Sequence, residues 1–99
     1  MAVTLVNTLK VIGSIEDFER VTGDLTDYMR RRPGYVSHQM LRSLRDPNVF
    51  VELATWERAE DHRAAVQSDG FRSRVTGLAG VIEKPTPDLY EVIHEAVAA

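Results

Sequence analysis

Four side chains of this 99-residue chain suit proton transfer or hydrogen bonding inside an apolar site. Asn7 stands between two leucines in the alternating run VTLVNTLK, and Glu52 and Trp56 lie four residues apart in VFVELATW. His62 follows in a charged, helix-like segment. Burying a polar group without a hydrogen-bond partner costs about 1–3 kcal/mol. Each of the four therefore indicates either a structural hydrogen bond or contact with a bound guest.

The sequence leaves a structural and a functional interpretation open for each residue. Asn7 either bonds to a neighbouring group or donates to a substrate oxygen. Trp56 is a core anchor, the wall of a site for a flat aromatic guest, or both. His62 is a packed boundary residue or an acid–base group, because imidazole changes charge near neutral pH. Glu52 is a base, an arginine partner, or one half of a salt bridge to a second subunit.

Composition narrows the class of protein. The net charge of −3, with 43% hydrophobic and 27% charged residues, is typical of one folded domain, which we assign to residues 1–99. The only basic run is RRR at 30–32, so a nucleic-acid partner is not expected. The chain has no cysteine and no histidine pair at metal-ligand spacing, so no metal site is predicted. No apolar run could span a bilayer, and we expect a cytoplasmic protein with no membrane partner.

The hydrophobic pattern predicts the elements that position these residues. Alternating, β-branched segments predict strands, and helical spacing after the expected N-cap Ser14 predicts a helix that ends at Pro33-Gly34. The predicted strands are 3–12, 35–44, 49–56 and 89–97, and two further helices are predicted over 58–67 and 71–78.

This order predicts the ferredoxin-like βαββαβ arrangement of α+β proteins. We expect an antiparallel four-stranded sheet with the helices on one face and the site between them. The 49–56 strand is apolar on both sides, so we expect its uncovered face to meet a second copy in a symmetric homodimer.

Two segments, RRRPGYVSHQML and VELATWERAEDHRAAVQSDGF, resemble the antibiotic biosynthesis monooxygenase superfamily of dimeric α+β barrels. The shared marks are Pro-Gly-aromatic opening the second strand, tryptophan plus an acidic residue ending the third, and Ser-x-x-Phe in the second helical region. The resemblance implies an oxygenase that needs no flavin, haem or metal, so no cofactor is expected. Its partners would be a small aromatic substrate and molecular oxygen.

The resemblance also implies site residues. In the branch that oxidises aromatic polyketides to quinones, an asparagine and a tryptophan line the site, and Asn7 and Trp56 fit these positions. Glu52 stands where those enzymes carry a second asparagine, and His62 where one of them has a tyrosine.

Three further residues complete the predicted site. An arginine of the same branch is matched by Arg72 or Arg74, and Tyr28 is added as a rim residue that contacts substrate. The haem-degrading branch carries its iron-ligand histidine where this chain has Val75, so haem is not expected.

The resulting hypothesis is a cofactor-independent monooxygenase that oxidises a polyketide-like phenol or anthrone to a quinone in secondary metabolism. Asn7 and Trp56 would donate hydrogen bonds, and His62 or Glu52 would move protons. Two alternatives remain: a non-oxidative polyketide cyclase or isomerase, and a non-catalytic dimer that binds a small ligand.

Overall fold

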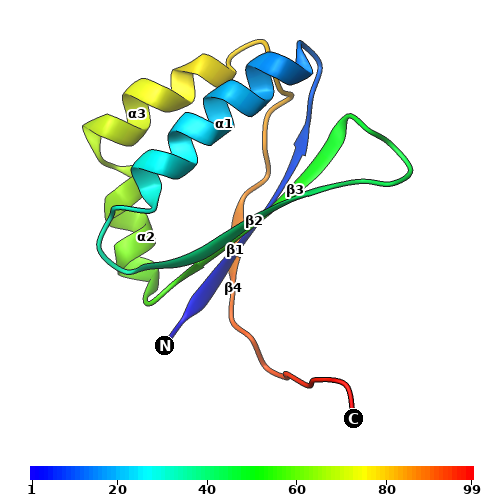
Figure 1. The fold of residues 1–99 in the computed structure, drawn as a ribbon. Coiled ribbons are helices and arrows are strands. Elements are labelled where there is room, and N and C mark those ends of the chain that lie inside the picture. The colour runs from blue at the N-terminus through cyan, green and yellow to red at the C-terminus, as the bar shows by residue number, and fades with distance from the viewer.

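The computed structural model describes all residues from Met1 to Ala99. Its sheet has the strand order β2-β3-β1-β4 with every neighbouring pair antiparallel, and Figure 1 shows the helices together on one face. This confirms the predicted ferredoxin-like α+β fold. The elements are β1 (Val3–Lys10), α1 (Ile15–Met29), β2 (Tyr35–Arg42), β3 (Val49–Trp56), α2 (Ala59–Val66), α3 (Asp69–Val75), the 3-10 turn η1 (Thr76–Leu78) and β4 (Asp88–Tyr90).

A local signal fixes the start of α1. The Ser14 side chain accepts a hydrogen bond from the Asp17 backbone N–H at 3.2 Å, as predicted for the N-cap. The helix ends at Met29, with Arg30 as its C-cap, a few residues before the predicted stop at Pro33-Gly34. Gly34 adopts a φ of 84°, a left-handed conformation that favours glycine, and it turns the chain into β2. The helix buries Phe18 against Phe50 on the inner sheet face, and it buries Val21, whose side chain lies beside Gly77 of the η1 turn.

The core consists of two apolar clusters along the inner sheet face. One surrounds Trp56, and the other contains Phe18 stacked on Phe50 with ring centroids 4.6 Å apart. Asn7 and Glu52 are directly opposite one another in the β1–β3 register. This pair lies between positions that belong to the two clusters, so two polar side chains interrupt the apolar inner face of the sheet.

A β-bulge changes the alternation of β2. Tyr35 pairs with Trp56 and Ser37 pairs with Thr55, so Val36 is an extra residue that has no partner of its own. After the bulge His38 pairs with Ala54, which is buried on the inner face. Tyr35 and His38 therefore both face the helices, although they are three residues apart.

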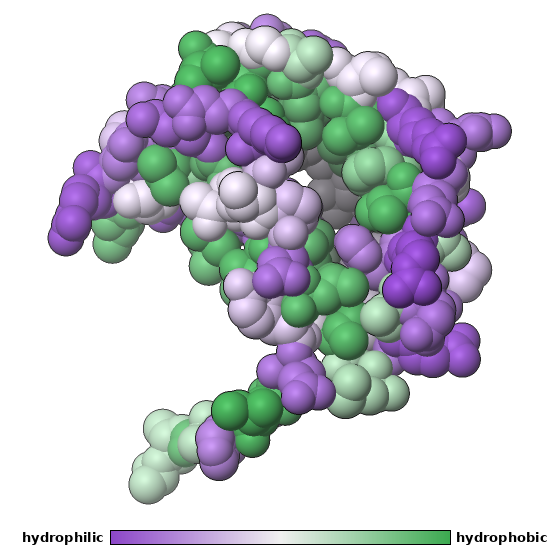
Figure 2. Space-filling model, turned by 180° about the vertical axis from the view of Figure 1, so that it is seen from behind, coloured by the Kyte–Doolittle hydropathy of each residue, from purple (hydrophilic) through white to green (hydrophobic).

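The predicted fourth strand, 89–97, is wrong in length, because β4 covers only Asp88–Tyr90. Tyr90 pairs with Thr4, and β1 begins at Val3, so β4 runs out of partner strand almost at once. Residues 91–99 are exposed and extend away from the domain, as Figures 1 and 2 show. The first strand is also shorter than predicted, with Val11 in an isolated bridge to Ile82.

The second helical region also differs from the prediction in its boundaries. The predicted helices 58–67 and 71–78 leave a break at residues 68–70, but Asp69 and Gly70 belong to α3, whose N-cap is Ser68. The Ser68 hydroxyl accepts a hydrogen bond from the Phe71 N–H at 3.3 Å, a cap that restarts the helix within the predicted break.

The outer face of the sheet has no helix over it. Val6 pairs with Leu53 and Leu41 pairs with Val51 on this face, and all four side chains are only partly buried or exposed. None of the helices combines the length and the apolar character needed to cross a bilayer.

Candidate functional site

A cavity of about 590 Å³ lies between the inner sheet face and the helices. This volume is within the range of sites for small molecules, about 300–1,000 Å³. Figure 2 shows a hollow with hydrophobic surface around much of it. The apolar lining includes Leu5, Leu9, Leu25, Met29, Met40, Phe71, Val75, Leu78 and Ile82, and the polar lining of the sheet and α2 consists of Asn7, Tyr35, His38, Glu52, Trp56 and His62.

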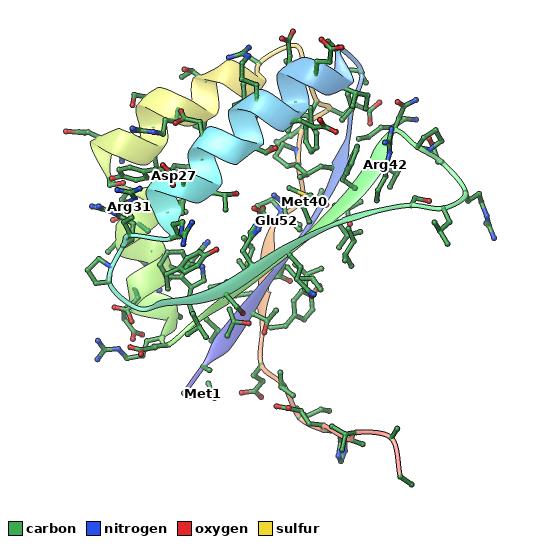
Figure 3. The ribbon with its side chains drawn as sticks, in the orientation of Figure 1. Met1, Asp27, Arg31, Met40, Arg42 and Glu52 are labelled. Carbon is green, nitrogen blue, oxygen red and sulfur yellow. The ribbon has the colours of Figure 1, made fainter.

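Glu52 is the centre of the polar part of this lining. Its Oε2 lies 3.0 Å from Nε2 of His38, and its Oε1 accepts a hydrogen bond of 3.4 Å from Nδ2 of Asn7. The side chains of His38 and Glu52 are 14% and 24% exposed. Figure 3 shows Glu52 on the sheet face that the helices cover, so it faces the cavity and not the outer face. Glu52 forms its ion pair with His38 and none with an arginine, and facing inward it does not fit a salt bridge across the outer sheet face.

The orientation of Asn7 follows from the chemistry of its partner. A carboxylate only accepts hydrogen bonds, so the amide nitrogen of Asn7 must face Glu52. The amide oxygen Oδ1 is left buried without a partner. The amide N–H of Asn7 is therefore already bonded within the protein, and its unused group is an acceptor. This differs from the sequence-based expectation of a free donor.

An aromatic group closes one end of the cavity. Trp56 is 1% exposed, and its indole meets the rings of Tyr35 and His62 edge to face, with centroids 5.3 Å and 5.7 Å away. Its Nε1 is buried and has no hydrogen-bond partner. Trp56 is thus both a core anchor and a wall of the cavity, and it holds an unused donor.

Burial shifts the pKa of two groups at this end. Desolvation lowers the pKa of His62, and the nearby charge of Glu52 opposes this only in part. Desolvation also raises the pKa of Tyr35; Arg30 lowers it and Glu52 raises it further. At neutral pH the imidazole of His62 and the phenol of Tyr35 are therefore both uncharged.

The three remaining predicted site residues are not among the cavity-lining residues. Tyr28 donates a hydrogen bond to Ser68 Oγ at 2.9 Å, and the guanidinium groups of Arg32 and Arg74 each lie 4.5 Å from its ring centroid. Arg72 is exposed on α3. Tyr28 and Arg74 join α1 to the α2–α3 region.

His38 is the site residue that the sequence analysis missed. Simple alternation from Tyr35 puts residue 38 on the opposite face, and only the bulge at Val36 brings it inside. The signal available in the sequence was the poor alternation of YVSHQMLR.

A family model described as antibiotic biosynthesis monooxygenase matches residues 2–76 of this chain. The chain belongs to the antibiotic biosynthesis monooxygenase family. A relative in this family, the deoxynogalonate monooxygenase of Streptomyces nogalater, is 34% identical over 76 residues. The match covers 77% of this chain and 64% of that protein, so the matched part is slightly less than two thirds of the relative's length.

Solved structures agree with the family assignment. SnoaB, a cofactor-independent oxygenase from Streptomyces nogalater, is 29% identical, with a TM-score of 0.90 and 95% of each chain covered. An antibiotic biosynthesis monooxygenase candidate from Caulobacter crescentus is 21% identical, with a TM-score of 0.85 over 94% of this chain and 91% of that one. The second likeness shows the shared fold alone.

Proposed function

We propose that this protein is a cofactor-independent monooxygenase that oxidises a flat, electron-rich phenol or anthrone to a quinone. The observation that carries the proposal is the apolar cavity in which Asn7, Glu52 and Trp56 share one lining. The family and the likeness to SnoaB, itself a cofactor-independent oxygenase, support the same activity.

The chemistry needs little from the protein beyond a base and a dry site. Oxygen reacts slowly with closed-shell molecules, and enzymes usually supply a cofactor to overcome this. An anthrone can supply the electrons itself after it loses a proton from its methylene carbon. The carbanion passes one electron to oxygen, the radical pair combines to a peroxide, and loss of water leaves the carbonyl. One oxygen atom enters the quinone and the other leaves as water, so the two methylene hydrogens and all four electrons are accounted for.

The unused polar atoms of the site match the two oxygens of such a substrate. Trp56 Nε1–H can donate to a carbonyl or to the developing enolate, and Asn7 Oδ1 can accept from a phenol O–H. Both atoms are covered by neighbouring protein atoms, so a guest must move those neighbours to reach them. His62, against the indole ring, is a further proton-transfer group of the proposal.

The direct test uses chelator-treated protein and dithranol, an anthrone, in air-saturated buffer. We expect oxygen uptake above the blank, with one molecule of oxygen consumed for each quinone formed. Under nitrogen, quenching of the fluorescence of the single tryptophan, Trp56, measures the binding of dithranol separately from its oxidation. Quenching without oxygen uptake would refute the oxygenase and favour the cyclase, isomerase or ligand-binding alternatives.

We also propose that the protein forms a homodimer through the outer sheet face. Only ten of the 99 residues are buried in one chain, and Val6, Leu41, Val51 and Leu53 lie on a face without cover. Light scattering after gel filtration should give twice the chain mass, and Val51→Lys should shift the protein toward monomer. A wild-type protein that stays monomeric at micromolar concentration would contradict this.

A further inference from the structure

We propose that His38 is the general base of this site and that Glu52 positions it. This inference rests on the proposed function, because it assigns the proton acceptor for that reaction. It departs from the sequence-based expectation that His62, or Glu52 directly, moves the proton.

The fold places His38 at the cavity by a specific device. The extra residue Val36 resets the alternation of β2, so that His38 takes an inner-face position opposite Ala54. Bulges occur often beside active sites, where they redirect a side chain. His38 also lines the shallow groove between α1 and β2 on the outside of the cavity. The imidazole thus borders both the cavity and this groove, which gives a proton taken from a guest a route out.

The hydrogen bond to Glu52 fixes which nitrogen of His38 is available. A carboxylate accepts only, so the hydrogen in the 3.0 Å contact is on Nε2, and Nδ1 carries a free lone pair. Nδ1 makes no hydrogen bond within the protein, yet it is not among the buried atoms that lack a partner. The basic nitrogen is therefore accessible.

Hydrogen bonds at both carboxylate oxygens hold Glu52 in the orientation in which it positions His38. Asn7 donates to Oε1 and His38 contacts Oε2, and no arginine or lysine forms a salt bridge with Glu52. The carboxylate charge therefore remains available to stabilise the imidazolium that forms when His38 takes a proton. This is the orienting role that an acidic residue has beside a catalytic histidine.

His62 lacks such support. Its ring packs edge-on against Trp56 at 5.7 Å, and no hydrogen bond fixes either ring nitrogen. Of the two cavity histidines, only His38 is hydrogen-bonded to a carboxylate that sets its tautomer.

In the proposed step, Nδ1 of His38 takes a methylene proton of the anthrone, and the electron pair of the C–H bond stays on the substrate as the enolate. After oxygen has added, the imidazolium returns the proton to the peroxide. Loss of water then leaves the quinone, with His38 neutral again. Oxygen is the only oxidant in the sequence.

Proton abstraction can be measured without oxidation. Under nitrogen in heavy water, wild-type protein should accelerate deuterium exchange at the methylene carbon of dithranol, followed by proton NMR. His38→Gln should lower the enzymatic exchange rate by about 10²–10⁴-fold, the usual contribution of a general base. His62→Gln should lower the exchange rate less than His38→Gln does. His94→Gln, on the exposed segment 91–99, is the matched control and should keep the wild-type rate.

The positioning role of Glu52 needs its own signal. Glu52→Gln should lower kcat for exchange more than it raises KM, whereas Glu57→Gln, an exposed neighbour, should change neither. Nitrogen-15 NMR of His38 should show a protonated Nε2 and a bare Nδ1 in the wild type, and a weaker preference for this tautomer in Glu52→Gln. If His38→Gln does not fold, His38→Asn replaces it.

The outcomes separate the two proposals. Exchange that depends on His38 but comes without oxygen uptake supports the base and refutes the oxygenase. Oxygen uptake that survives in His38→Gln, or exchange lost in His62→Gln but not in His38→Gln, overturns the base assignment. Absence of any exchange above the blank in the wild type overturns it as well.

Discussion

Replacing Trp56 by phenylalanine should change the stability of the protein far less than replacing it by alanine. Trp56 is 1% exposed, and a truncation from a large aromatic residue to alanine typically costs about 3–5 kcal/mol. That is a large part of the roughly 5–15 kcal/mol by which a domain is stable.

Two opposing effects set the size of the Trp56→Phe change. The smaller ring gives up roughly 40 Å² of buried apolar surface, worth about 1 kcal/mol at 25 cal/mol per Å². The same change removes a buried N–H that has no partner, which relieves about 1–3 kcal/mol. The free energy of unfolding should therefore stay within about 2 kcal/mol of the wild-type value.

Urea unfolding followed by circular dichroism measures both variants, because neither needs tryptophan fluorescence. Phe18→Leu is the matched control: Phe18 is also 1% exposed, and the change removes ring surface without relieving a polar atom. It should cost about 1 kcal/mol or more. If Trp56→Phe loses as much stability as Trp56→Ala, the indole N–H is satisfied in solution, and Trp56 has no unused donor for a substrate.

Three further changes test other parts of the structure. Burial lowers the pKa of His62, so below about pH 6.5 the unfolded chain binds more protons than the folded chain, and the free energy of unfolding should decrease as the pH is lowered. Urea titrations of His62→Gln across that range should show a smaller decrease. A Cβ at Gly70 would overlap the Tyr28 ring, so Gly70→Ala should cost about 1–3 kcal/mol, and an unchanged Tm would contradict the packing of α1 on α3. Ser14→Ala removes the N-cap of α1 and should cost about 1 kcal/mol, a fall of roughly 4–8 °C in Tm, unless the helix begins elsewhere.

The elements that were predicted correctly are those whose sequence pattern lies within a single segment of the chain. Ser14, the apolar stripe of α1 and the alternation of β1 and β3 each lie within one segment of the sequence. The position of Trp56 at the cavity follows in the same way from the inner face of β3.

The features that were missed depend on pairing between segments. The length of β4 is limited by where β1 begins, which the apolar alternation of 89–97 does not encode. The contact of Asn7 with Glu52 depends on the register of β1 against β3, and the position of His38 depends on the bulge against β3. The contact of Tyr28 with Arg74 likewise depends on how α1 packs against α3.

The bulge at Val36 has a consequence for how this family diverges. Gain or loss of a single codon in β2 exchanges the residues that face solvent for those that face the interior, while the strand stays paired beyond that point. Two relatives with the same histidine in an aligned column can therefore differ in chemistry, because one presents the imidazole to a guest and the other presents it to water. Whether a relative keeps the contact between His38 and Glu52 therefore depends on the β-bulge as much as on the two amino acids.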